Sequence, residues 1–598
     1  MKQENNLHTY AQALIFRSKA SLLRVRRGVL NVSSAKTRRF PFAANFIAQP
    51  VIAESKTPLW TESAPEEQFL LAGKVHNLRI AVKKLNGLEI PANAIFSFWK
   101  HVGRANKSNG FVAGRELREG CLIPGVGGGL CQISNALYDA ALKANFEIVE
   151  RHAHSQIVAG SLAEQGRDAT IFWNYIDFRF KSPTAFRIEA KLDKDYLIIR
   201  FRSENKPSTP VQIARKESIQ NPKSKIQNPN SCATCGIDEC FRSIKPPANL
   251  DFGRKAFLVD EFAAEFDDYL QKTRTAKDVL FIPLDGKRFR KANYAWNFQG
   301  FVETKQSLFV TFERSYKSRK LAAQGASRQF NLLAMYRKLA ESYTKSLKYD
   351  CTHLIVQQNL LPFLWQTGAL GGRTFDVLMS ALPMETLQKT LDFAAALHSE
   401  SQTLGDFRAD EKLIEAESEA LRNASKIITT HTAIAALFPE RAEILDWKML
   451  SERKIVKREN KKFTVVFPAS TVGRKGCYEL REAVRGLNLK TIGLGAQLEG
   501  ADFWSGFDYE KGGDDWLEKT DLVVLPAFVE HKPRRLLQAV ANHIPVIASV
   551  NCGLENVAAI QSIEAGNVRR LRAAISEFLP NASKIETAFK RQSAPARV

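Results

Sequence analysis

The chain has 598 residues, more than one hydrophobic core can organise, so three or four domains are expected. Its composition is that of a globular protein, with 44% hydrophobic and 25% charged residues. Lys and Arg (86) outnumber Asp and Glu (63), and the net charge of +23 favours an anionic partner. The basic residues are spread along the chain without a zinc-finger or RNA-binding signature, so nucleic acid is not expected as a partner.

The amino-terminal segment, residues 1–56, is basic and has neither the apolar core nor the cleavage site of a secretory signal. No run in the sequence is long enough to span a bilayer as a helix. Eight cysteines, most of them scattered singly, are typical of a reducing compartment, so a cytoplasmic protein is expected. Residues 20–39 mix aliphatic residues with Lys and Arg. This pattern fits either a solvated basic helix or a segment that lies on the anionic inner face of the membrane.

Residues 57–203 are rich in β-forming stretches and contain one good helical pattern, which begins near Gln132. They predict a mostly β or α+β domain. The predicted strand regions are 87–99, 146–158, 169–180, 185–192 and 196–203.

A linker is predicted after this domain, because residues 203–231 are rich in Pro, Asn, Ser and Lys and cannot bury much apolar surface. We place it, with the cysteine cluster that follows, at residues 204–248. Cys232, Cys235 and Cys240 have the spacing C-x2-C-x4-C, which suits zinc or iron. A closed zinc site needs four ligands, so either the fourth comes from another domain or the cluster is a redox pair or a turn.

The remaining sequence alternates short apolar strands with helical patterns, which is typical of parallel sheets with crossover helices. Two doubly wound α/β domains of the Rossmann type are expected, at residues 249–450 and 451–598. The predicted strands are 255–260, 278–283, 308–312, 351–357, 426–431, 463–470, 489–495, 521–528 and 545–550.

Cys131 stands where a glycine-rich turn, residues 125–129, enters the predicted helix. The amides and dipole of a helix start favour a thiolate, and a histidine on the next strand would complete a nucleophile with its base. His152 and His154 would share one face of that strand, and Asp168 at the start of a further strand could orient the imidazole. The order is similar to that of transglutaminase-like and papain-like enzymes.

Two other interpretations of Cys131 stay open. Cysteine is often buried, glycine turns often serve packing, and a histidine can satisfy backbone carbonyls, so the group could be structural. Cys131, His152 and His154 could instead bind a metal ion, with Cys121 as a fourth ligand.

Three stretches of the first domain, "GLEIPANAIFSFWKHVG", "GCLIPGVGGGLCQISNALYDAALKANFEIVERHAHS" and "GRDATIFWNYIDFRF", resemble the VanW family. The resemblance covers about residues 57–203; Asn135 stands where Ser or Thr is expected. It implies a cell-envelope or glycopeptide context and supplies no reaction. It also implies that the following residues form one site: Cys131, Gln132, Glu150, Arg151, His152, His154 and Asp168.

A second candidate site lies near the carboxy terminus. Arg474 and Lys475 follow the strand of "VVFPASTVGRKGCYELREAV" and precede a predicted helix at Gly476, an arrangement that suits a diphosphate. Glu530 follows the strand of "DLVVLPAFVEHKPRRLLQAVANHIPVIAS", where a carboxylate could hold sugar hydroxyls.

The order of these features resembles the donor-binding domain of retaining GT-B glycosyltransferases, over about residues 249–579. Arg474 and Lys475 match the family's diphosphate cations, and Glu530 matches its first donor-contacting Glu. Gln538 replaces the second Glu, and His543 replaces a turn glycine.

The GT-B resemblance implies an enzyme that transfers a sugar from a nucleotide-sugar donor without a required metal, to a glycan, lipid-linked or peptidoglycan-precursor acceptor. One alternative is a non-catalytic glycan- or nucleotide-binding protein, which Gln538 and His543 favour. The other alternative is cysteine-dependent amide chemistry in the VanW-like domain.

Overall fold

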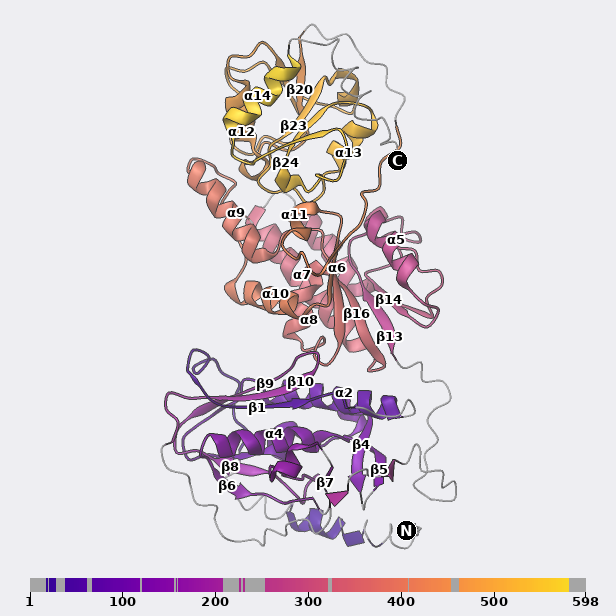
Figure 1. Ribbon diagram of the computed structural model, residues 1–598, viewed down its shortest axis with the longest axis vertical. Coiled ribbons are helices and arrows are strands. Elements are labelled where there is room, and N and C mark those ends of the chain that lie inside the picture. The colour runs from indigo at the N-terminus through magenta and orange to yellow at the C-terminus, as the bar shows by residue number, and fades with distance from the viewer. Residues whose placement is uncertain are drawn as a thin grey trace. The chain divides into compact units, whose positions relative to one another are not determined.

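A computed structural model describes residues 15, 18–19, 21–27, 38–61, 67–118, 121–154, 157–158, 160–207, 225–226, 230–231, 253–320, 325–406, 408–452 and 462–579. The chain forms two compact units. The first comprises residues 1–256 with 346–354 and 366–374, and the second comprises the remainder. Figure 1 labels many of the elements of both units.

The first unit is an α+β domain built from small sheets. An antiparallel four-stranded sheet has the order β1-β10-β9-β2, and β3, β8 and β6 form a second antiparallel sheet. β4 and β5 form an antiparallel hairpin, extended by β12. The bounds are β1 Val51–Pro58, β2 Glu89–Ile90, β3 Ile95–Ser97, β4 Ala113–Arg118, β5 Cys121–Val126, β6 Glu147–Glu150, β7 Ile157–Val158, β8 Arg179–Lys181, β9 Phe186–Leu192, β10 Tyr196–Arg202, β11 Lys225–Ile226 and β12 Asn230–Ser231.

Two helices complete this domain: α2 (Gln68–Leu85) packs on β4 and β9, and α4 (Leu130–Lys143) packs on β1 and β10. A short helix, α3, spans Phe98–Val102. The core between the sheets is aromatic, and the ring centroids of Phe146 and Phe186 lie 4.7 Å apart. Such ring pairs add about 0.5–1.5 kcal/mol beyond the burial of their area. The predicted domain start at residue 57 falls inside β1.

The strand predictions around the candidate site were too long. β6 ends at Glu150, so His152 and His154 lie beyond it, and residues 167–178 form turns and irregular backbone before β8. His152 and His154 therefore do not share a strand face, and Asp168 does not begin a strand.

In the second part of the chain, a seven-stranded sheet has the order β15-β14-β13-β16-β17-β18-β19. The pairs β14/β15, β17/β18 and β18/β19 are parallel. The strands are β13 Arg254–Leu258, β14 Val279–Ile282, β15 Glu303–Gln306, β16 Cys351–Gln357, β17 Thr374–Leu378, β18 Lys426–Thr429 and β19 Ala442–Ile444. The helices are α5 Ala264–Thr273, α6 Leu308–Lys320, α7 Gly325–Ser346, α8 Leu361–Gln366, α9 Met384–Leu397, α10 Glu411–Asn423 and α11 Thr432–Ala435.

The predicted strand at residues 308–312 is wrong, because these residues begin α6. Phe309 is 92% exposed and Phe312 is 50% exposed, so the β-forming side chains do not enter a core. Thr311 and Arg314 are buried instead, and their spacing of three residues is that of one helix face.

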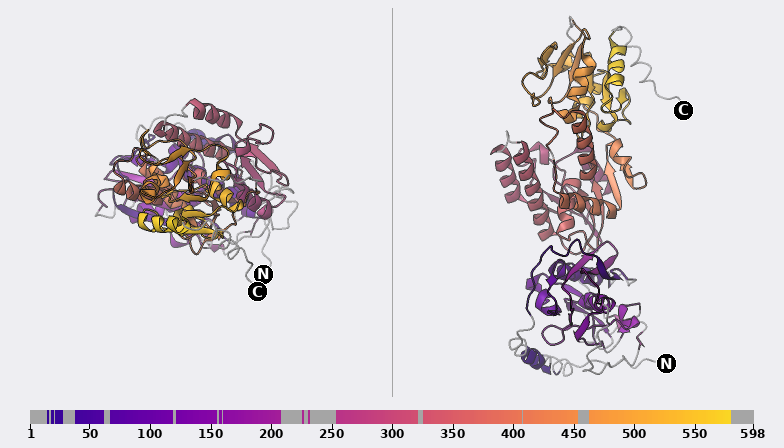
Figure 2. Two further views of the ribbon diagram at one scale, coloured as in Figure 1. Left: turned by 90° about the horizontal axis from the view of Figure 1, so that it is seen from above. Right: turned by 90° about the vertical axis from the view of Figure 1, so that its left-hand side faces the viewer.

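The last domain has a parallel six-stranded sheet in the order β22-β21-β20-β23-β24-β25, with α12 and α14 on one face and α13 on the other (Figures 1 and 2). Its central strands are buried on both faces, which crossover helices require. The expected Rossmann-type domains are confirmed. The bounds are β20 Thr464–Phe467, β21 Lys490–Gly493, β22 Tyr509–Lys511, β23 Leu522–Leu525, β24 Val546–Ser549, β25 Ile560–Ile563, α12 Cys477–Val484, α13 Arg534–Ala541 and α14 Val568–Phe578.

None of the helices in the described residues combines the length and the apolar character needed to cross a membrane. Cys232, Cys235 and Cys240, with most of the predicted linker, lie outside the described residues.

Candidate functional site

The glycine turn leads directly into α4 and places Cys131 in its first turn. Gly127 and Gly129 have φ values of +84° and +93°, a region that favours glycine. A Cβ atom on Gly128 would lie 2.4 Å from the backbone of Gly114 on β4, so the turn and the hairpin pack at a distance that only glycine allows. Cys131 is the second residue of α4, so its thiol lies at the positive end of the helix dipole.

His154 connects Cys131 to a buried carboxylate. Its Nδ1 lies 2.5 Å from Oδ1 of Asp168, and its backbone amide donates to Oδ2 at 2.5 Å. The other ring nitrogen, Nε2, is not used by Asp168, and the charges of the His154 and Cys131 side chains act on each other. Asp168 is 3% exposed. His154 and Asp168 are thus bonded to each other, and Cys131 and His154 line the same cavity.

The electrostatics of the pair favour an ionised thiol. Burial alone would raise the pKa of Cys131, but the charge and hydrogen bond of His154, with hydrogen bonds from Ile171 and Thr170, bring that pKa below its ordinary value. Burial alone would lower the pKa of His154. The Cys131 charge and the Asp168 hydrogen bond outweigh it and raise that pKa to about 10. Both shifts favour a thiolate–imidazolium ion pair over the neutral thiol and imidazole.

Other cysteines differ in this respect. Burial raises the pKa of Cys351 to about 11 and that of Cys552 to about 12, and it also raises the pKa of Cys477. A low-pKa thiol beside a histidine is the usual state of a reactive cysteine. These three thiols serve as references for the reactivity of Cys131.

Helix α4 also positions Asp168. Asn135 accepts a hydrogen bond from the Ala169 amide at 2.7 Å, and Ser134 donates to the Ala169 carbonyl at 2.5 Å. Arg151 donates to the Asp168 carbonyl at 2.6 Å. These bonds hold the irregular segment against the helix that carries Cys131. Asn135, the departure from the expected Ser or Thr, supports the site through the backbone.

Gln132 lines the same cavity as Cys131, and other groups bind its side chain and that of His152. Gln132 donates to Thr57 and to the Pro58 carbonyl at the end of β1. His152 lies 3.6 Å from Glu150, a carboxylate that also forms ion pairs with arginines.

The metal interpretation of the Cys131 group receives no support from the geometry. Among the residues that the structure describes, no three His, Cys, Asp or Glu side chains are placed to hold a metal ion. Cys121 lies at the start of β5, at the far end of the strand from the glycine turn.

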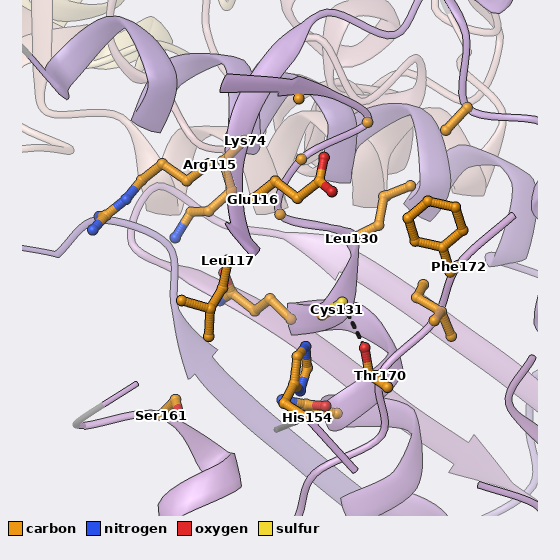
Figure 3. Close-up of a pocket in the computed structure, with 18 of the residues that line it drawn as sticks. Lys74, Arg115, Glu116, Leu117, Leu130, Cys131, His154, Ser161, Thr170 and Phe172 are labelled. Atoms are coloured by element: carbon orange, nitrogen blue, oxygen red, sulfur yellow. Dashed lines mark hydrogen bonds between the residues drawn. The ribbon is translucent and has the colours of Figure 1, made fainter. Parts of the chain in front are cut away.

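A cavity of about 1030 Å³ opens over Cys131 (Figure 3). Cys131 and His154 line it, together with the glycine turn and the aromatic rings of Trp99, Phe172 and Trp173. Its lining is basic: of the described charged residues, one is acidic, Glu116, and six are Lys or Arg, namely Arg24, Lys56, Lys74, Arg104, Lys107 and Arg115.

Sequence reasoning missed Lys74. Its position in α2 is 8% exposed, and burial, with the nearby Arg115 charge, lowers the pKa of its amine to about 7. The sequence carries a signal for it: a lysine inside the apolar run Phe69–Val75 of an otherwise buried helix face.

The second candidate site lies at the carboxyl ends of two neighbouring strands, β20 and β23. Lys475 lies 2.9 Å from Glu530 Oε2 and also donates to the Val529 carbonyl. Arg474 accepts the Phe528 and Val529 amides on its carbonyl oxygen. A Cβ atom on Gly476 would lie 2.2 Å from the Pro526 oxygen, so the two loops meet closely. The structure thus brings Arg474, Lys475 and Glu530 together.

The two departures from the GT-B pattern fall on α13 and its turn. Gln538 lies in α13 and is partly exposed. His543 has φ +58°, a left-handed conformation that favours glycine, and its side chain is exposed. The turn therefore keeps the backbone that a glycine would adopt.

Comparison with known proteins identifies the amino-terminal domain. Residues 73–202 match the model of the family described as VanW like protein. This part of the chain is a VanW-like domain. Vancomycin B-type resistance protein VanW of Enterococcus faecalis is 30% identical over 172 residues, which are 27% of this chain and 62% of that protein. YoaR of Bacillus subtilis, described as uncharacterized, is 36% identical over 107 residues, 18% of this chain and 35% of that protein.

The chain thus spans less than two thirds of either curated relative. Among solved structures, sucrose-phosphate synthase from Thermosynechococcus elongatus has 14% identity and a TM-score of 0.37, over 55% of this chain and 90% of that one. The lipopolysaccharide outer core galactosyltransferase WaaB has 12% identity and a TM-score of 0.34, over 57% and 95%.

Proposed function

We propose that the VanW-like domain catalyses acyl transfer or hydrolysis at an amide, with Cys131 as nucleophile, His154 as acid and base, and Asp168 as the group that orients His154. The observation that carries this proposal is the position of His154, which is hydrogen-bonded to Asp168, lines the same cavity as Cys131 and interacts electrostatically with its thiol. Nucleophile, base and orienting carboxylate in that order are the logic of thiol catalysis.

The proposed reaction proceeds in two steps. The Cys131 thiolate attacks the amide carbonyl carbon, and the oxygen takes the electron pair at the amino-terminal end of α4, where the helix dipole favours negative charge. His154 gives its proton to the leaving amine as the carbon–nitrogen bond breaks, which leaves a thioester. An acceptor amine or water then attacks the thioester, passes its proton to His154 and releases the thiolate.

The substrate class follows from the domain's relative. VanW of Enterococcus faecalis is named for vancomycin resistance. A peptide stem of the cell envelope is therefore the proposed amide.

The test is selective alkylation of the full chain with iodoacetamide, followed by mass spectrometry of each cysteine. Cys131 is expected to react at least about tenfold faster at pH 7 than Cys351, Cys477 and Cys552. His154→Gln should remove the difference, and His152→Gln serves as the matched control because its ring lies at Glu150. Equal reactivity of all four thiols would contradict the proposal and indicate that Cys131 has a structural role.

A second function is proposed for the carboxy-terminal unit: binding of a nucleotide-sugar diphosphate and transfer of its sugar. The observation that favours it is the meeting of Lys475, Arg474 and Glu530 at the ends of adjacent parallel strands, ahead of a helix start. Binding of UDP to the full chain, followed by hydrolysis of UDP-glucose, tests it. Binding without turnover would favour the non-catalytic alternative, and Gln538→Glu should then restore hydrolysis.

A further inference from the structure

The Lys74 side chain presents a cation to the cavity over Cys131. Among the described residues it has no ion pair or hydrogen-bonding partner for its amine, although its position is 8% exposed. A buried ammonium without a counter-ion is costly to a folded protein. Such a group commonly marks a functional site.

Contacts of its stem locate Lys74 close to the nucleophile. A Cβ atom on Gly129 would lie 2.1 Å from Cγ of Lys74, so the side chain passes directly over Gly129, two residues before Cys131. One turn further along α2, Asn77 donates to the Gly128 carbonyl at 2.9 Å. Helix α2 therefore holds both the glycine turn and Lys74.

The surroundings add positive charge and little negative charge. The Arg115 charge acts on Lys74, although Arg115 itself is 3.6 Å from Glu67 and donates to Thr61. Glu116, the acidic lining residue, packs against Gly125. In the view of Figure 3, Lys74 and Arg115 occupy one side of the cavity, and Cys131 and His154 another.

We propose that Lys74, assisted by Arg115, binds an anionic group of the substrate, a carboxylate or a phosphate, while the acyl carbon reaches Cys131. This inference rests on the proposed thiol chemistry and specifies its substrate class. The anion supplies the counter-ion that the Lys74 amine lacks among the described residues, and an ammonium–carboxylate or ammonium–phosphate hydrogen bond in a recessed site is strong.

Two alkylating reagents of nearly equal size test this proposal on the full chain. Iodoacetate is an anion and iodoacetamide is neutral; with each, the Cys131 thiolate displaces iodide and forms a carbon–sulfur bond. The quantity measured is the ratio of the two rate constants, relative to the same ratio for glutathione. We expect the ratio for Cys131 to exceed that for glutathione by about tenfold or more.

Variants assign the preference to one side chain. Lys74→Met should bring the ratio to within about twofold of glutathione, and Lys74→Arg should retain most of the preference. Lys56→Met is the matched control, because Lys56 lines the same cavity but is exposed, and it should leave the ratio unchanged. Acetate and inorganic phosphate are then compared as inhibitors of the iodoacetate reaction at equal ionic strength, and the stronger inhibitor identifies a carboxylate or a phosphate.

The outcomes separate the two proposals. Fast reaction of Cys131 with iodoacetamide, without a preference for iodoacetate, would overturn the anion site and leave the thiol chemistry standing. A Cys131 that reacts no faster than the buried thiols would overturn both. An equal loss of preference in Lys74→Met and Lys56→Met would assign the effect to net charge and overturn the role of Lys74. If neither acetate nor phosphate inhibits the iodoacetate reaction, the role of Lys74 is overturned as well.

Discussion

His154 and Asp168 are joined twice, since the backbone amide and the ring Nδ1 of His154 bond to the two carboxylate oxygens, each at 2.5 Å. The double attachment sets both the position and the orientation of the imidazole. Because Nδ1 is occupied, Nε2 is left for the Cys131 thiol. The ionisation of Cys131 therefore depends on a carboxylate that does not touch it.

Asp168→Asn is expected to slow alkylation of Cys131 with little change in fold. The amide keeps the size of the side chain but removes the charge that helps to raise the His154 pKa, so the ion pair with the thiolate weakens. In the native protein the pKa of Cys131 is lowered from its ordinary value, so its rate with iodoacetamide should level off at a lower pH than in the variant. In the variant the rate should rise about tenfold per pH unit and be at least tenfold lower at pH 7.

The control for this prediction is His152→Gln, which should keep the pH profile of the native protein. The rate is measured from pH 6 to 9 by mass spectrometry of the peptide that contains Cys131. A native rate that rises tenfold per unit up to pH 9 would contradict an ionised thiol.

Lys74→Met is expected to stabilise the protein, and the gain should depend on pH. The amine titrates at 10.5 in the unfolded chain and at about 7 in the folded one, so the unfolded state holds one more proton between these values. The cost of the charged amine is present in full below pH 7, declines as the pH rises and vanishes above 10.5. At 1.36 kcal/mol per pKa unit the gain is roughly 3–5 kcal/mol at pH 6.

Urea unfolding of the native and variant chains at pH 6, 8 and 10 measures this gain. Lys56→Met, at an exposed position on the same cavity, should change the free energy of unfolding by less than about 0.5 kcal/mol at each pH. A Lys74→Met variant that is less stable at pH 6 would mean that the amine has a counter-ion in the folded state.

Gly129→Ala should destabilise the domain far more than a matched glycine substitution elsewhere. At Gly129 the positive φ costs an alanine about 1–2 kcal/mol, and its Cβ would also meet Lys74 Cγ at 2.1 Å. Gly166 has φ +75° with nothing within 4 Å, so Gly166→Ala carries the backbone cost alone. Urea unfolding should show a loss of about 3 kcal/mol or more for Gly129→Ala and about 1 kcal/mol for Gly166→Ala. Equal losses would mean that Lys74 moves aside freely.

The site was partly predictable because some of its features are local. A glycine turn that runs into an apolar helix locates Cys131 from sequence alone, and strand–loop–helix patterns located Lys475 and Glu530. Which of His152 and His154 lies beside Asp168 was not predictable from sequence. It depends on where β6 ends and on the hydrogen bonds from Ser134 and Asn135 of α4 to the backbone of Ala169. Lys74 was missed because it comes near Cys131 only through its contact with Gly129, which lies more than fifty residues further along the chain.

Lys475→Met is expected to weaken UDP binding to the full chain by roughly tenfold or more, about 1.4 kcal/mol, because a diphosphate would lose one charge-assisted hydrogen bond. Glu530→Gln should have the opposite effect on the diphosphate, since Lys475 would no longer be neutralised at 2.9 Å by a carboxylate. Lys490→Met is the matched control. This lysine pairs with Glu510 and is the first residue of β21, so it lies at the amino ends of the parallel strands, whereas the loop of Lys475 follows their carboxyl ends. Isothermal titration at two salt concentrations measures all three, and equal weakening in Lys475→Met and Lys490→Met would show that UDP responds to the net charge of the domain and not to a built site.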